Sequence, residues 1–178
     1  MQIQTDRLII RSLRPSDEGA FVEMASDGSL TEIFGDCSRC REWMGGWIRE
    51  SLQLEAEDNP RHAYLAFAVE EKAGGQVVGS VGSSYYEDLE RVGVTYFIGA
   101  PFRGRRYMAE ALRAFSRYFF ERYDEDALFA TAAAANAASC RTLERAGFTR
   151  FDTRVYQDLF DGEPALSHFY ELKRDARP

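Results

Sequence analysis

The sequence predicts a single α+β domain, from the chain length, the composition and the order of its helix and strand patterns. The chain has 178 residues, which is typical of one domain. Hydrophobic residues make up 45% and aromatic residues 13%, so the chain can build a buried core, and disordered, collagen-like and coiled-coil classes are excluded. No repeat and no linker interrupts the mixed helix and strand patterns, and we therefore expect one domain over residues 1–178.

The first part of the chain predicts one strand and two helices. Leucine and isoleucine at Leu8–Leu13 predict a strand. Ser16 fits a helix N-cap, and the helical spacing that follows ends near Asp27. A second helical pattern runs from Arg39 to about Glu57, and the pair Gly45-Gly46 is expected to interrupt it.

The middle of the chain predicts three strands and a long helix. The apolar runs Tyr64–Glu70 and Gln76–Ser83 flank the turn Gly74-Gly75, which is typical of a β-hairpin. Val92–Ile98 predicts the third strand. From Met108 onward apolar residues recur at helical spacing, in the strongest helical pattern of the sequence.

The last part predicts a strand, a helix and a final strand pair. Leu128–Ala132 is short and apolar, as in a strand, and a helix is expected from about Asn136 to Ala146. Gly147 suits the residue just past the end of that helix. From Phe148 onward the pattern predicts two strands around an Asp161-Gly162 turn.

Charge, hydropathy and cysteine usage limit which binding partners and which cellular compartment we expect. The net charge of −7 disfavours nucleic acid, because phosphate contacts need a concentrated basic face. No apolar run reaches the roughly 18 to 20 residues that cross a bilayer, and the N-terminus lacks an export signal, so we expect no membrane partner and a cytoplasmic location. Cys37 and Cys40 could start a zinc site or form a redox pair, but further ligands are scattered, and we expect incidental thiols and no metal.

The segment from Phe97 to Ala111 predicts an anion-binding site. A glycine-bearing turn with three arginines joins a strand to a helix, and the start of a helix offers about four unpaired N–H groups and a partial positive charge. Six arginines and only two glutamates lie between Pro101 and Tyr123, so positive charge is concentrated here. Taken alone, such a junction is equally typical of an ordinary turn with solvated arginines.

Several motifs, taken in their order along the chain, resemble the GNAT acetyltransferases. These motifs are Thr5-Asp-Arg-Leu8, Val78-Gly-Ser-Val-Gly82, Arg103-Gly-Arg-Arg-Tyr107 with Glu110-Ala111, and Asn136-Ala-Ala-Ser139 followed by Gly147-Phe148. The resemblance covers nearly the whole chain and is greatest to the ribosomal-protein N-terminal (Rim-type) branch. It implies a central, mixed, mostly antiparallel twisted sheet of about six to seven strands, flanked by about four helices.

The resemblance implies acetyl-CoA as co-substrate, with its pyrophosphate on the turn at 103–109 and its pantetheine along the strand at 94–98. The implied cofactor residues are Tyr96, Phe97, Ile98, Arg103, Gly104, Arg105, Arg106, Tyr107, Met108, Ala109, Asn136 and Ser139. Arg106 stands where the family usually has Gly or Ala, so we expect a strained backbone or a shifted turn there. Pro101 replaces a Gln or Arg of the family.

The resemblance also implies catalytic roles. Ser139 is a candidate proton donor to the departing thiolate, because Leu143 occupies the position of a tyrosine in many relatives. Asn136 is implied to hold an amide of the cofactor, and a helix N-cap explains it equally well. Glu87 and Glu90, before the cofactor strand, are candidate general bases, although a solvated loop explains them too.

We therefore expect an acetyl-CoA-dependent N-acetyltransferase that moves an acetyl group directly to a primary amine. The acceptor is a protein N-terminus or a small cationic amine, since the acidic remainder of the chain attracts cations. The alternative is an acyl-CoA-binding module whose catalysis has lapsed, which Arg106, Pro101 and the lack of an obvious base favour. The enzyme is expected to be a monomer or a homodimer.

Overall fold

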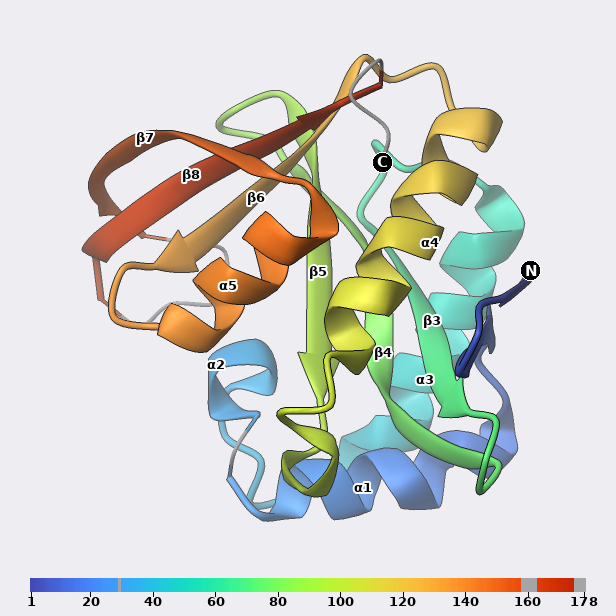
Figure 1. The fold of residues 1–178 in the computed structure, drawn as a ribbon. Helices are drawn as coiled ribbons and strands as arrows, with labels where there is room; N and C mark the ends of the chain where they lie inside the picture. Colours follow the sequence, from blue (N-terminus) through green and yellow to red (C-terminus); the bar gives the residue numbers. More distant parts are fainter. Residues whose placement is uncertain (29, 158–162, 175–178) are drawn as a thin grey trace.

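One eight-stranded sheet runs through the protein, with helices on both faces (Figure 1). The computed structural model describes residues 1–28, 30–157 and 163–174. Its strands are β1 (Gln2–Gln4), β2 (Leu8–Ser12), β3 (Tyr64–Glu71), β4 (Gln76–Tyr86), β5 (Arg91–Ile98), β6 (Ala127–Ala133), β7 (Thr149–Tyr156) and β8 (Ala165–Lys173). Its helices are α1 (Glu18–Ser26), α2 (Thr31–Phe34), α3 (Cys40–Glu57), α4 (Tyr107–Arg122) and α5 (Ala137–Ala146), with 3₁₀ turns at Pro15–Asp17 and Ala100–Phe102.

The strand order is β1-β2-β3-β4-β5-β6-β8-β7, and every neighbouring pair is antiparallel except β5 and β6. A parallel pair needs a crossover, and α4 supplies it. In Figure 1, β5 runs downward while β6 turns away from it. The two strands that α4 connects therefore part from each other along most of their length.

The two faces of the sheet carry separate hydrophobic cores. On one face α4 and α5 pack through residues such as Phe115, Phe119 and Leu143, which are fully buried. On the other face α1 and α3 pack through residues such as Phe21 and Met44. Figure 1 shows α4 and α5 in front of the strands and α3 behind them. Burial on both faces fixes the sheet as a rigid platform for its loops.

Each of the seven strands and four longer helices expected from the sequence is present, and the observed sheet has one strand more. The addition is β1, which is too short and too polar to have a strand pattern of its own. The single-turn helix α2 was likewise not predicted. The expected Asp161-Gly162 turn lies outside the described residues.

Two local predictions were wrong. Ser16 is not an N-cap, because it lies inside the 3₁₀ turn that precedes α1. Asp17, the next residue, is held by a buried two-pronged ion pair with Arg11, at 2.8 and 2.9 Å. Gly45-Gly46 does not interrupt α3, which is continuous. A Cβ at Gly45 would lie 2.9 Å from the carboxylate of Glu18, so this glycine permits the close approach of α1 and α3.

The described residues contain no helix with the length and apolar character that a membrane span requires. Cys37, Cys40 and Cys140 are buried free thiols. Burial raises the pKa of the Cys37 thiol. No group of three or more candidate metal ligands occurs within the part of the chain that the structure describes.

Candidate functional site

The parting of β5 from β6 leaves one edge of β5 open. On its β4 side, β5 is paired at all eight residues, from Arg91 to Ile98. On its β6 side the only pairing among the described residues joins Gly93 to Phe129. The backbone groups of 94–98 on that side therefore face a gap between strands. Since backbone N–H and C=O groups require partners, this edge can accept an extended ligand that carries amide groups.

The turn after β5 leads into a helix start with open donors. Gly104 has φ of +78° and Arg106 has φ of +62°, and α4 begins at the next residue. No described side chain caps this helix. The side chains of Tyr107 and Met108 are buried, so these two residues offer a ligand only their backbone N–H groups. The turn thus presents a helix N-terminus that is free to bind an anion.

Arg106 carries backbone strain, which is one of the two outcomes expected where the family usually has Gly or Ala. A left-handed conformation at a residue with a Cβ costs roughly 1–2 kcal/mol, and glycine avoids that cost. The chain keeps an arginine there, and its side chain lines a depression of about 380 Å³ beside α4. The depression is lined by Arg7, Arg106, Ala109, Arg113 and Arg145. Arg7 is paired with Glu110, but Arg106, Arg113 and Arg145 leave the depression with a net positive charge.

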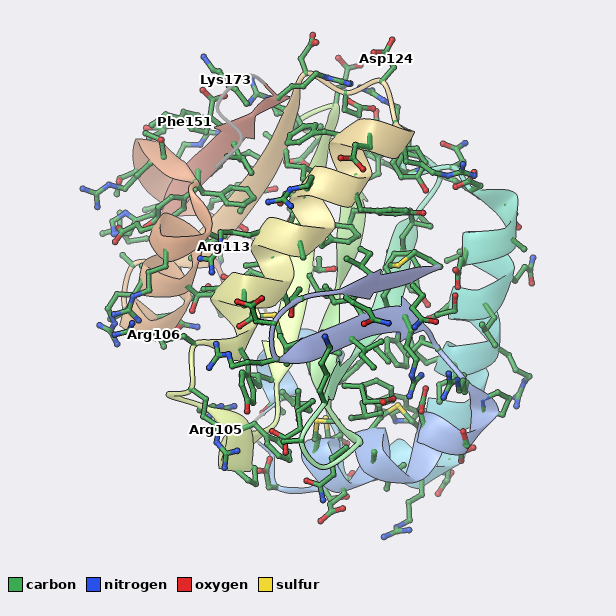
Figure 2. The ribbon with its side chains drawn as sticks, turned by 45° about the vertical axis from the view of Figure 1, so that its right-hand side comes forward. Arg105, Arg106, Arg113, Asp124, Phe151 and Lys173 are labelled. Carbon is green, nitrogen blue, oxygen red and sulfur yellow. The ribbon has the colours of Figure 1, made fainter. Side chains whose placement is uncertain are left out.

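The arginines of this depression come from three parts of the chain. Figure 2 shows Arg106 at the start of α4, Arg105 on the preceding turn and Arg113 further along the helix toward α5. Arg113 donates to the carbonyl oxygen of Arg145 at 2.9 Å, which ties α4 to the end of α5. Sequence reasoning missed Arg7, Arg113 and Arg145 as site residues. Helical spacing from Arg106 could have found Arg113, but no local signal points to the other two.

Ser139 lies across the gap from β5 and contacts it directly. The Ser139 Oγ is 2.7 Å from the phenol oxygen of Tyr96, and the same phenol donates to the Ser139 carbonyl at 3.4 Å. Burial is the largest cause that raises the pKa of Tyr96 well above its ordinary value, so the phenol is neutral and able to donate. The sequence prediction did not anticipate this pair of hydroxyls, because β5 and α5 are far apart in the chain.

Asn136 is the N-cap of α5, which is one of the two roles expected from the sequence. Its side-chain oxygen accepts from the backbone N–H of Ser139 at 3.1 Å. This bond fixes the first turn of α5 and with it the position of Ser139. The carboxamide nitrogen of Asn136 is not needed for the cap, so the implied contact with a cofactor amide stays a prediction.

Phe97 belongs to the core and not to the open side of β5. Its ring lies 5.2 Å from Phe34 and 5.9 Å from Phe21 on the opposite face of the sheet. The Phe97 side chain is therefore a core residue. Any contact of Phe97 with a ligand in the gap would therefore use its backbone.

The two candidate general bases lie away from the Ser139–Tyr96 pair. Glu87 and Glu90 are exposed on the turn between β4 and β5, at the opposite end of β5 from the turn that leads into α4 (Figure 1). Asp88, between them, accepts from the Tyr156 hydroxyl at 3.1 Å, which brings this turn to the end of β7. The side chain bonded to Ser139 is Tyr96, and the role of Glu87 and Glu90 stays a prediction.

A family model described as an acetyltransferase (GNAT) domain matches residues 7–149, about four-fifths of the chain. The chain belongs to the GNAT acetyltransferases. The match includes β5, the turn between β5 and α4, and all of α4 and α5. Comparison with curated proteins by sequence gives no match.

Solved structures share this fold over nearly the whole chain. RimL, a ribosomal L7/L12 alpha-N-protein acetyltransferase in complex with coenzyme A, has a TM-score of 0.82 at 15% identity, covering 99% of both chains. A GNAT-family acetyltransferase from Bacillus anthracis has a TM-score of 0.80 at 19% identity, covering 98% of this chain and 99% of that one. An acetyltransferase from Salmonella typhimurium that modifies the N-terminal serine of L7/L12 has a TM-score of 0.76 at 14% identity, covering 97% and 99%.

Proposed function

We propose that this protein transfers an acetyl group from acetyl-CoA to a primary amine. One observation carries the proposal: the open edge of β5 continues directly into an uncapped helix start lined with arginines. An open strand edge suits a chain with amide groups, and a cationic helix start suits phosphates. Coenzyme A combines these two features in one molecule, with the amides and the phosphates in series.

In this proposal the turn and the arginine depression hold the phosphates. The backbone N–H groups of 105–109 point to the pyrophosphate, and Gly104 lets the backbone approach it closely. Arg106, Arg113 and Arg145 add charge beside the same helix start. The pantetheine lies along 94–98, where β6 has parted from β5.

The bound co-substrate supplies an activated thioester, and the residues of the gap act on it. A backbone N–H of β5 polarises the thioester carbonyl, and the amine nitrogen forms a bond to the carbonyl carbon as the C–S bond breaks. Ser139 donates a proton to the departing thiolate and regains one from solvent, and the neutral Tyr96 phenol, 2.7 Å away, hydrogen-bonds to the Ser139 oxygen during the transfer. The acceptor ammonium loses one proton to a base to expose its lone pair, and the nitrogen loses a second proton after the C–N bond has formed; Glu87 and Glu90 are the candidates for the base.

The acceptor we propose is a protein N-terminus or a small cationic amine. The two relatives named for ribosomal protein L7/L12 act on a protein N-terminus. A net charge of −7, together with a cationic patch at the phosphate turn, leaves the rest of this surface acidic and attractive to an amine. We expect the enzyme to act in the cytoplasm, as a monomer or a homodimer, without nucleic acid.

A second candidate is a module that binds acyl-CoA but no longer transfers the acyl group. Within the described residues no carboxylate contacts the Ser139–Tyr96 pair, and this favours the second candidate. Both functions predict that acetyl-CoA binds, but only the first predicts transfer of the acetyl group to an amine.

Two measurements test the proposal. Acetyl-CoA at about 100 times its dissociation constant should stabilise the fold by about 2.7 kcal/mol, seen as a rise in melting temperature. A thiol-release assay with a panel of amines and N-terminal peptides should then identify an acceptor. Binding without turnover for any acceptor supports the second candidate, and no binding at millimolar acetyl-CoA by the folded protein contradicts both.

A further inference from the structure

The connection between β1 and β2 is fastened to the first turn of α4, about a hundred residues away in the chain. Glu110 is the anchor point. It accepts from the Thr5 hydroxyl at 2.5 Å and from the Arg7 backbone N–H at 3.0 Å. It also accepts from Arg7 Nε at 2.8 Å, and its side chain is only 13% exposed. One carboxylate is thus bound by three donors of one short segment.

The same arginine reaches the backbone of the phosphate turn. Arg7 Nη1 donates to the carbonyl oxygen of Arg105 at 3.0 Å, and its guanidinium lies 4.8 Å from the ring centre of Tyr107. Arg105 and Tyr107 flank Arg106, the left-handed residue at the start of α4. The contacts of Arg7 therefore fall on both sides of the strained position. In Figure 2 the N-terminal strands β1 and β2, in pale blue-violet, lie beside the first turns of α4.

These contacts orient the turn for an anion. A carbonyl that is bonded to Arg7 on the inner side cannot turn toward the ligand, where it would repel a phosphate. Holding Glu110 fixes the first turn of α4, whose N–H groups are the donors. Burial alone would raise the pKa of Glu110, but the bonds from Thr5 and Arg7 outweigh it and lower the pKa, so the anchor stays ionised at neutral pH.

We propose that Thr5 and Arg7 clamp the phosphate turn in its ligand-binding conformation by holding Glu110 and the Arg105 carbonyl. They act as positioning residues and not as catalytic ones. The inference rests on the proposed binding of acetyl-CoA to this turn. It assigns a role in cofactor affinity to an N-terminal segment that lies outside the strand–turn–helix unit.

Glu110→Gln is the decisive variant, because the clamp and simple electrostatics predict opposite results. Loss of a negative charge beside a phosphate site should tighten the binding of an anion if charge alone matters. The clamp predicts weaker binding, by about tenfold, because the bonds of Arg7 and Thr5 to a carboxylate are weakened. Calorimetry with coenzyme A measures the dissociation constant directly, without an acceptor.

A matched control lies at the other end of the same helix. Asp58 binds Arg122 and Tyr123 at the end of α4, and Arg122 is 51% exposed, close to the 47% of Arg7. Asp58→Asn should leave the dissociation constant within about twofold of the parent, because this site is far from the turn. Thr5→Val should weaken binding as Glu110→Gln does.

Two further readouts separate positioning from charge and from a general loss of stability. Arg7→Lys keeps the cationic charge but not the forked donor set. The clamp therefore predicts weaker binding of coenzyme A, whereas charge alone predicts unchanged affinity. Amide hydrogen exchange over 103–110 should be faster in free Glu110→Gln and unchanged in Asp58→Asn. Parental or tighter affinity in Glu110→Gln and Thr5→Val, or full affinity in Arg7→Lys, would overturn the clamp. Failure of the parent itself to bind coenzyme A would instead refute the proposed function.

Discussion

The two helices that start beside the gap begin in different ways. At α5, Asn136 caps the backbone N–H of Ser139, so the first turn is satisfied from within the chain. At α4 no described side chain takes that place, and the residue before the helix, Arg106, has a left-handed backbone. The comparison teaches that one helix start serves to position a side chain, whereas the other leaves its donors open for a ligand.

The largest expected effect comes from Gly104→Val, which places a side chain in the turn before the uncapped start of α4. A Cβ at Gly104 meets no atom within 4 Å in the free protein, so the change adds backbone strain at φ of +78° and a side chain on the ligand side. We expect affinity for coenzyme A to fall by about 100-fold or more, measured by calorimetry.

Gly75→Val is the matched control for that change. Gly75 has φ of +65° in the β3–β4 turn, and its Cβ would also meet nothing within 4 Å. The two variants should lose similar stability, and only Gly104→Val should lose affinity. Equal affinity in both variants would mean that the phosphates bind elsewhere.

Ser139→Ala tests the side chain that the capped helix positions. A proton donor to the thiolate acts in the transition state, so kcat should fall by about 100-fold while the dissociation constant of acetyl-CoA stays nearly unchanged. The Asn136 cap is retained, because it uses the backbone of Ser139. A loss smaller than about threefold would show that water or substrate protonates the thiolate.

Asn136→Ala removes the cap itself. We expect a loss of about 1 kcal/mol in the free energy of unfolding, the usual value for an N-cap, measured by denaturant titration. A much larger fall in the affinity for coenzyme A would show that the Asn136 side chain binds the ligand as well.

Arg106→Gly should relax the strained start of α4. Glycine adopts the same left-handed conformation without the strain of a Cβ, so the fold should be stabilised by up to about 1 kcal/mol. Arg113 and Arg145 keep the depression cationic, so affinity for coenzyme A should be equal to or greater than in the parent. If affinity falls strongly, the Arg106 side chain contributes more to binding than its backbone strain costs.

The smallest expected effect is a difference between the two helix starts in their response to low pH. Glu110 has a lowered pKa in the fold, so its stabilising contribution is complete above the ordinary glutamate pKa of about 4.3 and is lost as the pH falls through the lower folded value. Asn136 does not titrate. Amide NMR shifts at 106–110 should therefore change below about pH 4, while those at 136–140 stay constant; equal changes in both would contradict this assignment.

The sequence by itself determined the local elements. The apolar spacing from Met108 onward and the glycines of the β3–β4 turn act between near neighbours, so α4 and the hairpin follow from propensity and periodicity. The glycine turn before α4 was predictable for the same reason. The strain at Arg106 was expected from the resemblance, because the family usually has Gly or Ala at that position.

Only the tertiary structure decided how these elements meet. The gap between β5 and β6, the contact of Tyr96 with Ser139 and the hold of Thr5 and Arg7 on Glu110 join segments about 40 to 100 residues apart. Such contacts depend on strand order and on the face that each side chain takes, and a pattern of neighbouring residues contains neither. A polar side chain such as Glu110 looks the same in sequence whether it is solvated or bound by three donors, because its environment is made by distant parts of the chain.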